Sequence, residues 1–394
     1  MRTRKNIEKM SVEEIVKLKR AYKSLQDETN NGYELIAGIH GLPDPISCPH
    51  HLATQAFLPW HRKYLLAFET LLQKYEPDVM LPYWDWATTE LPNTPDKLPV
   101  ACQPDEQNGI DVNPLSTAPM HWVAPFIEEF GDQMLPETIE WLGKGWSLRL
   151  PNDESAFERF RTGQTDAMRE AEFEKFSNAV EQPHDDLHGY IGHHMGAVET
   201  SAFDPIFWMH HSNIDRLWAI WQRVNPNVAQ HPFPDAPLRE YPDTTTKEVL
   251  DITALDYTYE QMETEDIDLF SLLKKEDFET FAKANRIPET SRELQPRRKF
   301  IVLENLEMPM RGTVVLNFFK KSGGDEKSLG SLTLFGLRGL SHSHGQMLPF
   351  SRRLNITGEN ISDAKDLKIT AHNLEGKKVN INSVLSKPPI ISEQ

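Results

Sequence analysis

Apolar residues recur at helical spacing through much of the first 224 residues. Residues 12–29 carry apolar positions about one turn apart after Ser11, a residue type favoured at helix N-caps. The same spacing predicts further helices over residues 34–40, 58–75, 153–182 and 204–224. The fourth of these is expected to break near Thr162–Gly163. A continuation over residues 184–190 is expected to begin after Pro183, because proline is tolerated in a first helical turn.

The pattern changes near residue 296. From Phe300 onward, β-type runs alternate with polar and glycine-rich turns: FIVLENL, GTVVLNFF, SLTLFGL, LKITAHNL and VNINSVL. Earlier, residues 87–120 are rich in Pro, Asp, Asn and Thr and predict a long surface loop. We therefore predict an α+β protein with a helical domain over 1–240, a connecting segment over 241–297 and an antiparallel β-sandwich over 298–394.

Bulk properties narrow the class of protein. A chain of 394 residues favours two domains, and 39% hydrophobic and 26% charged residues are ordinary for a globular protein. A net charge of −17 disfavours nucleic-acid partners. The sequence has neither a run long enough to cross a membrane nor a visible signal peptide. We therefore expect no membrane partner, and a cytoplasmic location if residue 1 is the native start. Oligomeric state is not indicated.

Histidines gather in two short regions. Ten of the fifteen lie within residues 40–61 and 184–211. His184 and His188 are four residues apart, which places both imidazoles on one helix face, about one turn from each other. Taken singly, His61 and His211 would be interpreted as hydrogen-bonded core histidines. Two clusters, each able to supply three neutral imidazoles, instead indicate two metal ions, and imidazole suits copper.

Two details restrict this interpretation. Position 185 is Asp, so the HExxH pattern of a zinc peptidase is not present. A mononuclear zinc or iron hydrolase would also leave three aligned histidines unexplained. His210 and His211 are adjacent, and neighbouring residues on a helix point about 100° apart. We therefore expect His211 to face the metal and His210 to point away.

Several motifs resemble those of type 3 copper proteins, the group of tyrosinases, catechol oxidases and molluscan hemocyanin units. The second-copper signature of that group is similar to the stretch from Asp204 to Asp215, with Pro205, Phe207, His210 and His211 between. The first-copper signature is similar to FLPWHR over residues 57–62, followed by Glu69. Further segments that resemble the group are IAGIHGLP, PYWDW, LDYTY and the β-rich tail. The similarity covers nearly the whole chain.

The resemblance implies two copper ions in a four-helix-bundle core, with O2 as co-substrate. The first copper (CuA) would take His40, one of His50 and His51, and His61, and the second (CuB) would take His184, His188 and His211. Spacing to His61 favours His51 as the middle ligand. Cys48 would favour His50, because many members join a cysteine at that position to the ligand as a thioether. The alternative role for Cys48 is that of a small buried side chain.

Acidic residues near the second cluster are candidates for proton transfer. The resemblance implies that Glu181 holds a water that deprotonates a phenol, and that Asp185 assists or weakens this step. Glu181 could instead only stabilise the N-terminus of the following helix. Asp215 is a candidate to orient a ligand imidazole, or a solvated or cap-like acid near Arg216. Gly189 would leave open space for an organic substrate, or mark a helix irregularity.

Two functions from different classes use the same six ligands. The first is oxidation of o-diphenols to o-quinones, with or without prior ortho-hydroxylation of monophenols, on small phenolic substrates. The alternative is reversible O2 carriage, as in a hemocyanin unit. The single-unit length of the chain favours an enzyme. By its resemblance to latent enzymes, the C-terminal domain is a candidate lid over the site.

Overall fold

The computed structural model describes thirteen stretches of the chain and one single residue between them. They are residues 1–29, 32–41, 55–88, 91–121, 127–128, 139–140, 143–151, 156–225, 231–262, 298–307, 309, 312–322, 325–336 and 350–393.

The helices of the first domain follow the apolar periodicity closely. Those whose bounds lie within the described residues are α1 (Val12–Gln26), α2 (Gly32–Gly38), α3 (Phe57–Gln73), α6 (Ala156–Met168), α7 (Phe173–Ile191) and α8 (Pro205–Val224). Ser11 caps α1 through a capping box with Glu14, in which each side chain accepts a hydrogen bond from the other residue's backbone N–H. Asp204 caps α8 by accepting from the N–H of Ile206, and Pro205 occupies the first turn.

The breaks that the sequence predicted at Thr162–Gly163 and at Pro183 are not present. Pro183 stands inside α7, which continues through it, and α6 continues through Gly163. The reason is the contact between the two helices: a Cβ added at Gly163 would lie 3.1 Å from Cδ of Pro183. A glycine opposite the proline ring lets the helices pack closely, and the real interruption falls between Met168 and Phe173.

Short strands accompany the helices, and longer ones follow them. The strands are β1 (Arg2–Arg4), β2 (Glu106–Gln107), β3 (Ile110–Asp111), β4 (Pro237–Leu238), β5 (Tyr241–Thr245), β6 (Tyr257–Tyr259), β7 (Lys299–Leu306), β8 (Val314–Ser322), β9 (Asp325–Leu334), β10 (Phe350–Asn355), β11 (Leu367–Asn373) and β12 (Ile390–Glu393). Among the described residues, β7–β12 form two three-stranded antiparallel sheets, ordered β10-β7-β12 and β11-β8-β9. The α+β class is therefore confirmed, whereas the four-helix core and the sandwich stay predictions.

One sequence expectation for a strand was wrong, and two strands were missed. The run VNINSVL contains a turn of 3-10 helix at Ile381–Ser383 rather than a strand. Strands β10 and β12 were not foreseen, because neither segment is a long apolar run.

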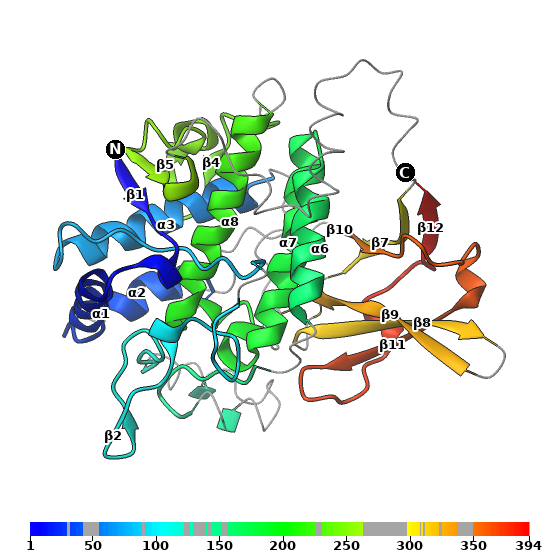
Figure 1. The fold of residues 1–394 in the computed structure, drawn as a ribbon, viewed down its shortest axis with the longest axis horizontal. Coiled ribbons are helices and arrows are strands. Elements are labelled where there is room, and N and C mark those ends of the chain that lie inside the picture. The colour runs from blue at the N-terminus through cyan, green and yellow to red at the C-terminus, as the bar shows by residue number, and fades with distance from the viewer. Residues whose placement is uncertain are drawn as a thin grey trace.

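Each half of the chain has its own hydrophobic core. The first extends from Ile7 to Val249, and the second from Ile301 to Val384. The helices occupy one side of the molecule and β7–β12 the other, with α6 and α7 nearest the sheets (Figure 1). Residues 241–262, which were assigned to a connecting segment, pack on the first domain, because β6 pairs in parallel with β1.

The C-terminal sheets pack directly against α7. The N–H of Thr333 donates to Asp186 Oδ1 at 2.8 Å, and the hydroxyl of Thr313 donates to the carbonyl of Gly196 at 2.8 Å. A Cβ added at Gly189 would lie 2.8 Å from Cγ2 of Thr333. The expectation that Gly189 leaves open space for a substrate is therefore wrong, because Thr333 fills that space.

Within the part of the chain that the structure describes, no helix combines the length and apolarity needed to cross a lipid bilayer.

Candidate metal centre

Four elements of the first domain bring the predicted histidines together. His40 follows α2, His61 lies in α3, His184 and His188 lie in α7, and His211 lies in α8. All five side chains are buried, with exposed fractions of 3% or less. Their convergence depends on packing of α3 and α7 against α8. His50, His51 and Cys48 lie outside the described residues, so the choice of middle ligand stays open.

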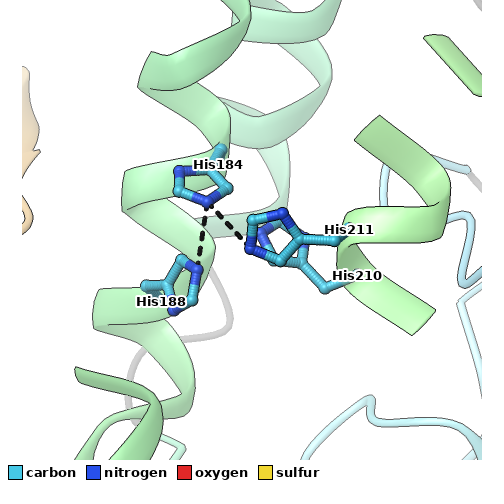
Figure 2. Close-up of side chains that lie close together, drawn as sticks. All are labelled: His184, His188, His210 and His211. Carbon is cyan, nitrogen blue, oxygen red and sulfur yellow. Dashed lines mark hydrogen bonds between the residues drawn. The ribbon is translucent and has the colours of Figure 1, made fainter. Parts of the chain in front are cut away.

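The second cluster is a triangle of ring nitrogens. Nε2 of His184 lies 3.1 Å from Nε2 of His188 and 3.2 Å from Nε2 of His211 (Figure 2). His188 Nδ1 lies 2.7 Å from the carbonyl of Met195, and His184 Nδ1 lies 3.0 Å from Asp185 Oδ1. Because these oxygens only accept, each Nδ1 carries the proton. In the neutral rings of His184 and His188, the two Nε2 atoms therefore present lone pairs to each other.

The first cluster has the same design in its two described members. His40 Nδ1 donates to the carbonyl of Val198 at 2.8 Å, and His61 Nδ1 donates to the carbonyl of Phe57 at 2.8 Å. Among the described atoms, Nε2 of His40 is buried without a hydrogen-bond partner. The rings of His61 and His211 are stacked, with centroids 4.2 Å apart, so the two clusters adjoin.

His210 departs from the expectation that it would point away. Its ring is fully buried and lies in the same cluster, with its centroid 4.9 Å from that of His184 and 5.0 Å from that of His188 (Figure 2). The indole N–H of Trp86 donates to His210 Nδ1 at 3.1 Å. Since an indole only donates, neutral His210 carries its proton on Nε2. Its Nε2 then has no lone pair for a metal, although the ring faces the cluster.

Burial keeps the α8 histidines neutral. Desolvation, followed by neighbouring imidazoles, lowers the pKa of His210 and of His211 well below the ordinary value. Neutral imidazole is the form that binds a metal, so the burial that lowers these pKa values also prepares the cluster for a cation.

The candidate acids lie beside His184 and contact the C-terminal domain. Arg352 of β10 donates through Nη2 to Asp185 Oδ2 at 2.7 Å and to Glu181 Oε2 at 3.4 Å. Burial disfavours the charge of Arg352, but Asp185 and Glu181 outweigh it and raise the pKa of the guanidinium. Phe335, just beyond β9, stacks on the His188 ring at a centroid distance of 4.2 Å.

Asp215 has a different role from the one considered. It accepts from Arg62 Nε at 2.5 Å, from Arg4 Nη1 at 3.2 Å, and from the hydroxyls of Tyr257 and Tyr259 at 2.7 and 2.6 Å. These are its described hydrogen-bond partners, and none is a histidine. Asp215 therefore joins α8 to α3, β1 and β6 rather than orienting an imidazole.

Comparisons with known proteins identify the family to which this chain belongs. The family model "Common central domain of tyrosinase" matches residues 30–224. Grixazone synthase of Streptomyces griseus is 31% identical over 255 residues, which cover 52% of this chain and 80% of that protein. The chain belongs to the type 3 copper proteins.

The relatives within the type 3 copper proteins include carriers and enzymes. G-type hemocyanin of Enteroctopus dofleini is 31% identical over 240 residues, 56% of this chain, but this is 8% of the hemocyanin's length. A functional unit of octopus hemocyanin has a similar fold, with a TM-score of 0.75 at 21% identity over 100% of this chain and 99% of that one. Mushroom tyrosinase, solved in latent and active forms, also has a similar fold. The comparison gives a TM-score of 0.70 at 18% identity and covers 100% of this chain and 92% of the tyrosinase chain.

The residues present fit a type 3 copper centre. Three nitrogens bound to one ion at about 2 Å, the usual metal–imidazole distance, are themselves about 3 Å apart. The observed 3.1 and 3.2 Å separations match that arrangement. A cation between them would also relieve the facing lone pairs. His40 and His61 offer the same Nε2 donors to a second ion beside the first.

Three functional neighbours of this type 3 site were not identified from the sequence. Phe335 stands in the apolar run SLTLFGL and would be assigned to a strand core. Arg352 lies 167 residues from Asp185, and nothing near it in the sequence marks it. Trp86 belongs to PYWDW, a segment that was singled out, but its hydrogen bond to His210 depends on tertiary structure.

Proposed function

We propose that this protein is a copper-dependent phenol oxidase that converts o-diphenols to o-quinones with O2. In this proposal CuA is held by His40, His61 and one of His50 and His51, and CuB by His184, His188 and His211. α2, α3, α7 and α8 form the four-helix core, and the C-terminal sheets form the sandwich. When bound, the copper pair would supply the electrons that reduce O2.

The observation that carries the proposal is a buried carboxylate pair beside the second histidine cluster. Asp185 and Glu181 are 1% and 2% exposed, and Asp185 bonds His184 directly. A carrier of O2 needs no acid or base, whereas a phenol must lose its hydroxyl proton before it is oxidised. An unperturbed phenol has a pKa of about 10, so a base near the cluster has a clear task. We assign this task to Glu181, with Asp185 beside it.

The C-terminal domain acts as a lid in this proposal. Phe335 covers the face of His188, and its centroid is 6.1 Å from that of His184. An aromatic side chain at this place occupies the approach that a phenolic ring would use. The protein is therefore proposed to be latent in this conformation, with turnover after Phe335 moves.

The same contact favours a second candidate function. A site covered by Phe335 admits O2 more easily than a phenol, as reversible O2 carriage requires. The similarity to hemocyanin units over the full chain supports this alternative. The two functions differ in whether opening the site produces turnover.

Copper-loaded Phe335→Ala protein tests the choice. We expect two coppers per chain, and catechol oxidation several-fold faster than in the wild type, because the His188 face is opened. Phe318→Ala is the control, since Phe318 is also buried but lies in the core of the C-terminal domain. O2 uptake that reverses under vacuum, without quinone formation in either variant, would establish the carrier instead.

Comparing a monophenol with its catechol then tests Glu181. Glu181→Gln should depress monophenol turnover much more than catechol turnover while copper content stays unchanged. If both activities fall together with stability, Glu181 has only a structural role.

A further inference from the structure

Arg352 of the C-terminal sheets forms ion pairs with both acids beside the second histidine cluster. Its side chain is 2% exposed, and one nitrogen, Nη2, contacts both Asp185 and Glu181. The strand itself holds the guanidinium in place. Nη1 donates to the carbonyl of Ser351 at 3.2 Å, and the guanidinium carbon lies 4.7 Å from the ring centroid of Phe350.

The two oxygens of Asp185 connect different domains. Oδ2 accepts from Arg352 at 2.7 Å, and Oδ1 accepts from Nδ1 of His184 at 3.0 Å. A carboxylate is planar and rigid, so fixing one oxygen restricts the other. The position of Arg352 therefore restricts the plane of the His184 ring. Partners of this kind set the tautomer and direction of metal-binding imidazoles.

Because these three side chains are buried, losing one of them is costly to the other two. Asp185, Glu181 and Arg352 are each at most 2% exposed, so water does not compensate for the loss of a partner. Without Arg352, these two buried carboxylates would lose the guanidinium that both contact. Asp185 would then be free to rotate, and the ring of His184 would lose its fixed acceptor.

We propose that Arg352 is a positioning residue which couples docking of the C-terminal domain to the geometry of His184 through Asp185. The proposal rests on the proposed function, in which His184 binds the second copper. Docking then does more than cover the site with Phe335. It also holds a metal ligand in its binding orientation, and release of the domain loosens the copper that the domain covers.

Copper release from the full-length, copper-loaded protein tests the coupling. Arg352→Gln should weaken retention of copper against a strong copper(I) chelator by about 10- to 100-fold, the usual effect of losing such a partner. The matched control is Arg353→Gln. Arg353 is the next residue of β10 and pairs with Glu170 of the first domain. Because the Arg353 side chain is 23% exposed, this control should lower the melting temperature less than Arg352→Gln does, and it should leave copper retention unchanged.

Two further variants separate the coupling from general damage. In an Asp185→Asn background, Arg352→Gln should add little further copper loss, because both changes break the same connection. Arg352→Lys keeps the charge and should give an intermediate retention even if the Gln variant does not fold. Equal retention in the Arg352→Gln and Arg353→Gln proteins, or additive losses with Asp185→Asn, would overturn the role of Arg352. A wild type that binds no copper would instead overturn the proposed function.

Discussion

His210 and His211 lie in one cluster, yet their ring nitrogens have different partners. Trp86 donates to Nδ1 of His210, whereas Nε2 of His211 faces Nε2 of His184 at 3.2 Å. The proton of neutral His210 is therefore on the nitrogen that a metal would need. Within the described residues, no hydrogen bond to the buried Nδ1 of His211 fixes the tautomer of that ring.

This difference predicts the effects of two alanine substitutions. His211→Ala should remove the second copper and abolish turnover, because one corner of the nitrogen triangle is lost. His210→Ala should keep both coppers, with at most a cost in stability from the cavity. Metal analysis of the loaded proteins measures both. Loss of copper from His210→Ala as complete as that from His211→Ala would show that the tautomer assignment is wrong.

Part of the site could be predicted from residues alone. The i, i+4 spacing of His184 and His188 placed both on one face of α7, and the structure has them 3.1 Å apart at Nε2. The orientation of His210 could not be predicted, because it depends on Trp86. The acceptors of Nδ1 on His40 and His188 are backbone carbonyls of Val198 and Met195, and backbone atoms leave no mark in a sequence.

Helix α7 is the element on which the site and the domain interface both depend. Its middle faces Gly163 of α6 through Pro183, and nearer its C-terminal end Gly189 faces Thr333 of β9. Helical periodicity predicted the existence of α7 and α8 correctly. It misplaced the break at Pro183, because local rules for proline do not include the space that a glycine on the neighbouring helix provides.

Gly189→Ala tests how tightly α7 and β9 fit. Alanine has the higher helix propensity, by about 1 kcal/mol, but its Cβ would lie 2.8 Å from Cγ2 of Thr333. Overpacking of this kind costs about 1 to 3 kcal/mol, so we expect a net loss of stability in urea unfolding. Adding Thr333→Ala removes the clashing methyl group and should restore most of the loss. A Gly189→Ala protein more stable than the wild type would mean that the contact between α7 and β9 adjusts to the added methyl group without a clash.

At the scale of the whole molecule, a buried ionic network connects distant parts of the first domain. Arg4 of β1 bonds Glu69 of α3 at 3.0 Å and Asp215 of α8 at 3.2 Å, and Arg62 bonds the other oxygen of Asp215. Burial opposes ionisation of Asp215, but Arg62, Arg4 and two tyrosine hydroxyls outweigh it. The pKa of this carboxyl is therefore lowered in the folded protein.

Asp215→Asn should destabilise the protein by about 3 to 5 kcal/mol near neutral pH, because it leaves buried guanidinium charge without its partner. The contribution of a carboxyl with a lowered folded pKa is complete above its unfolded pKa, about 4, and is lost as pH falls through the folded value. The stability difference between wild type and variant should therefore shrink below about pH 4. Urea unfolding at several pH values measures it.

The control for this substitution is Asp256→Asn. Asp256 pairs with the N-terminal amine and Arg2 but is 66% exposed, so its removal should change stability little. A difference between wild type and Asp215→Asn that stays constant down to strongly acidic pH would contradict the lowered pKa.

The pairing of β1 with β6 bears on how the chain is made. Arg4 and Tyr259, joined by a hydrogen bond, are 255 residues apart, which takes a ribosome roughly 13 to 51 s at about 5 to 20 residues per second. Throughout that interval β1 lacks β6, the strand with which it pairs. Folding of the helical domain is therefore completed only after residues 257–259 have left the ribosomal tunnel, however early its helices form.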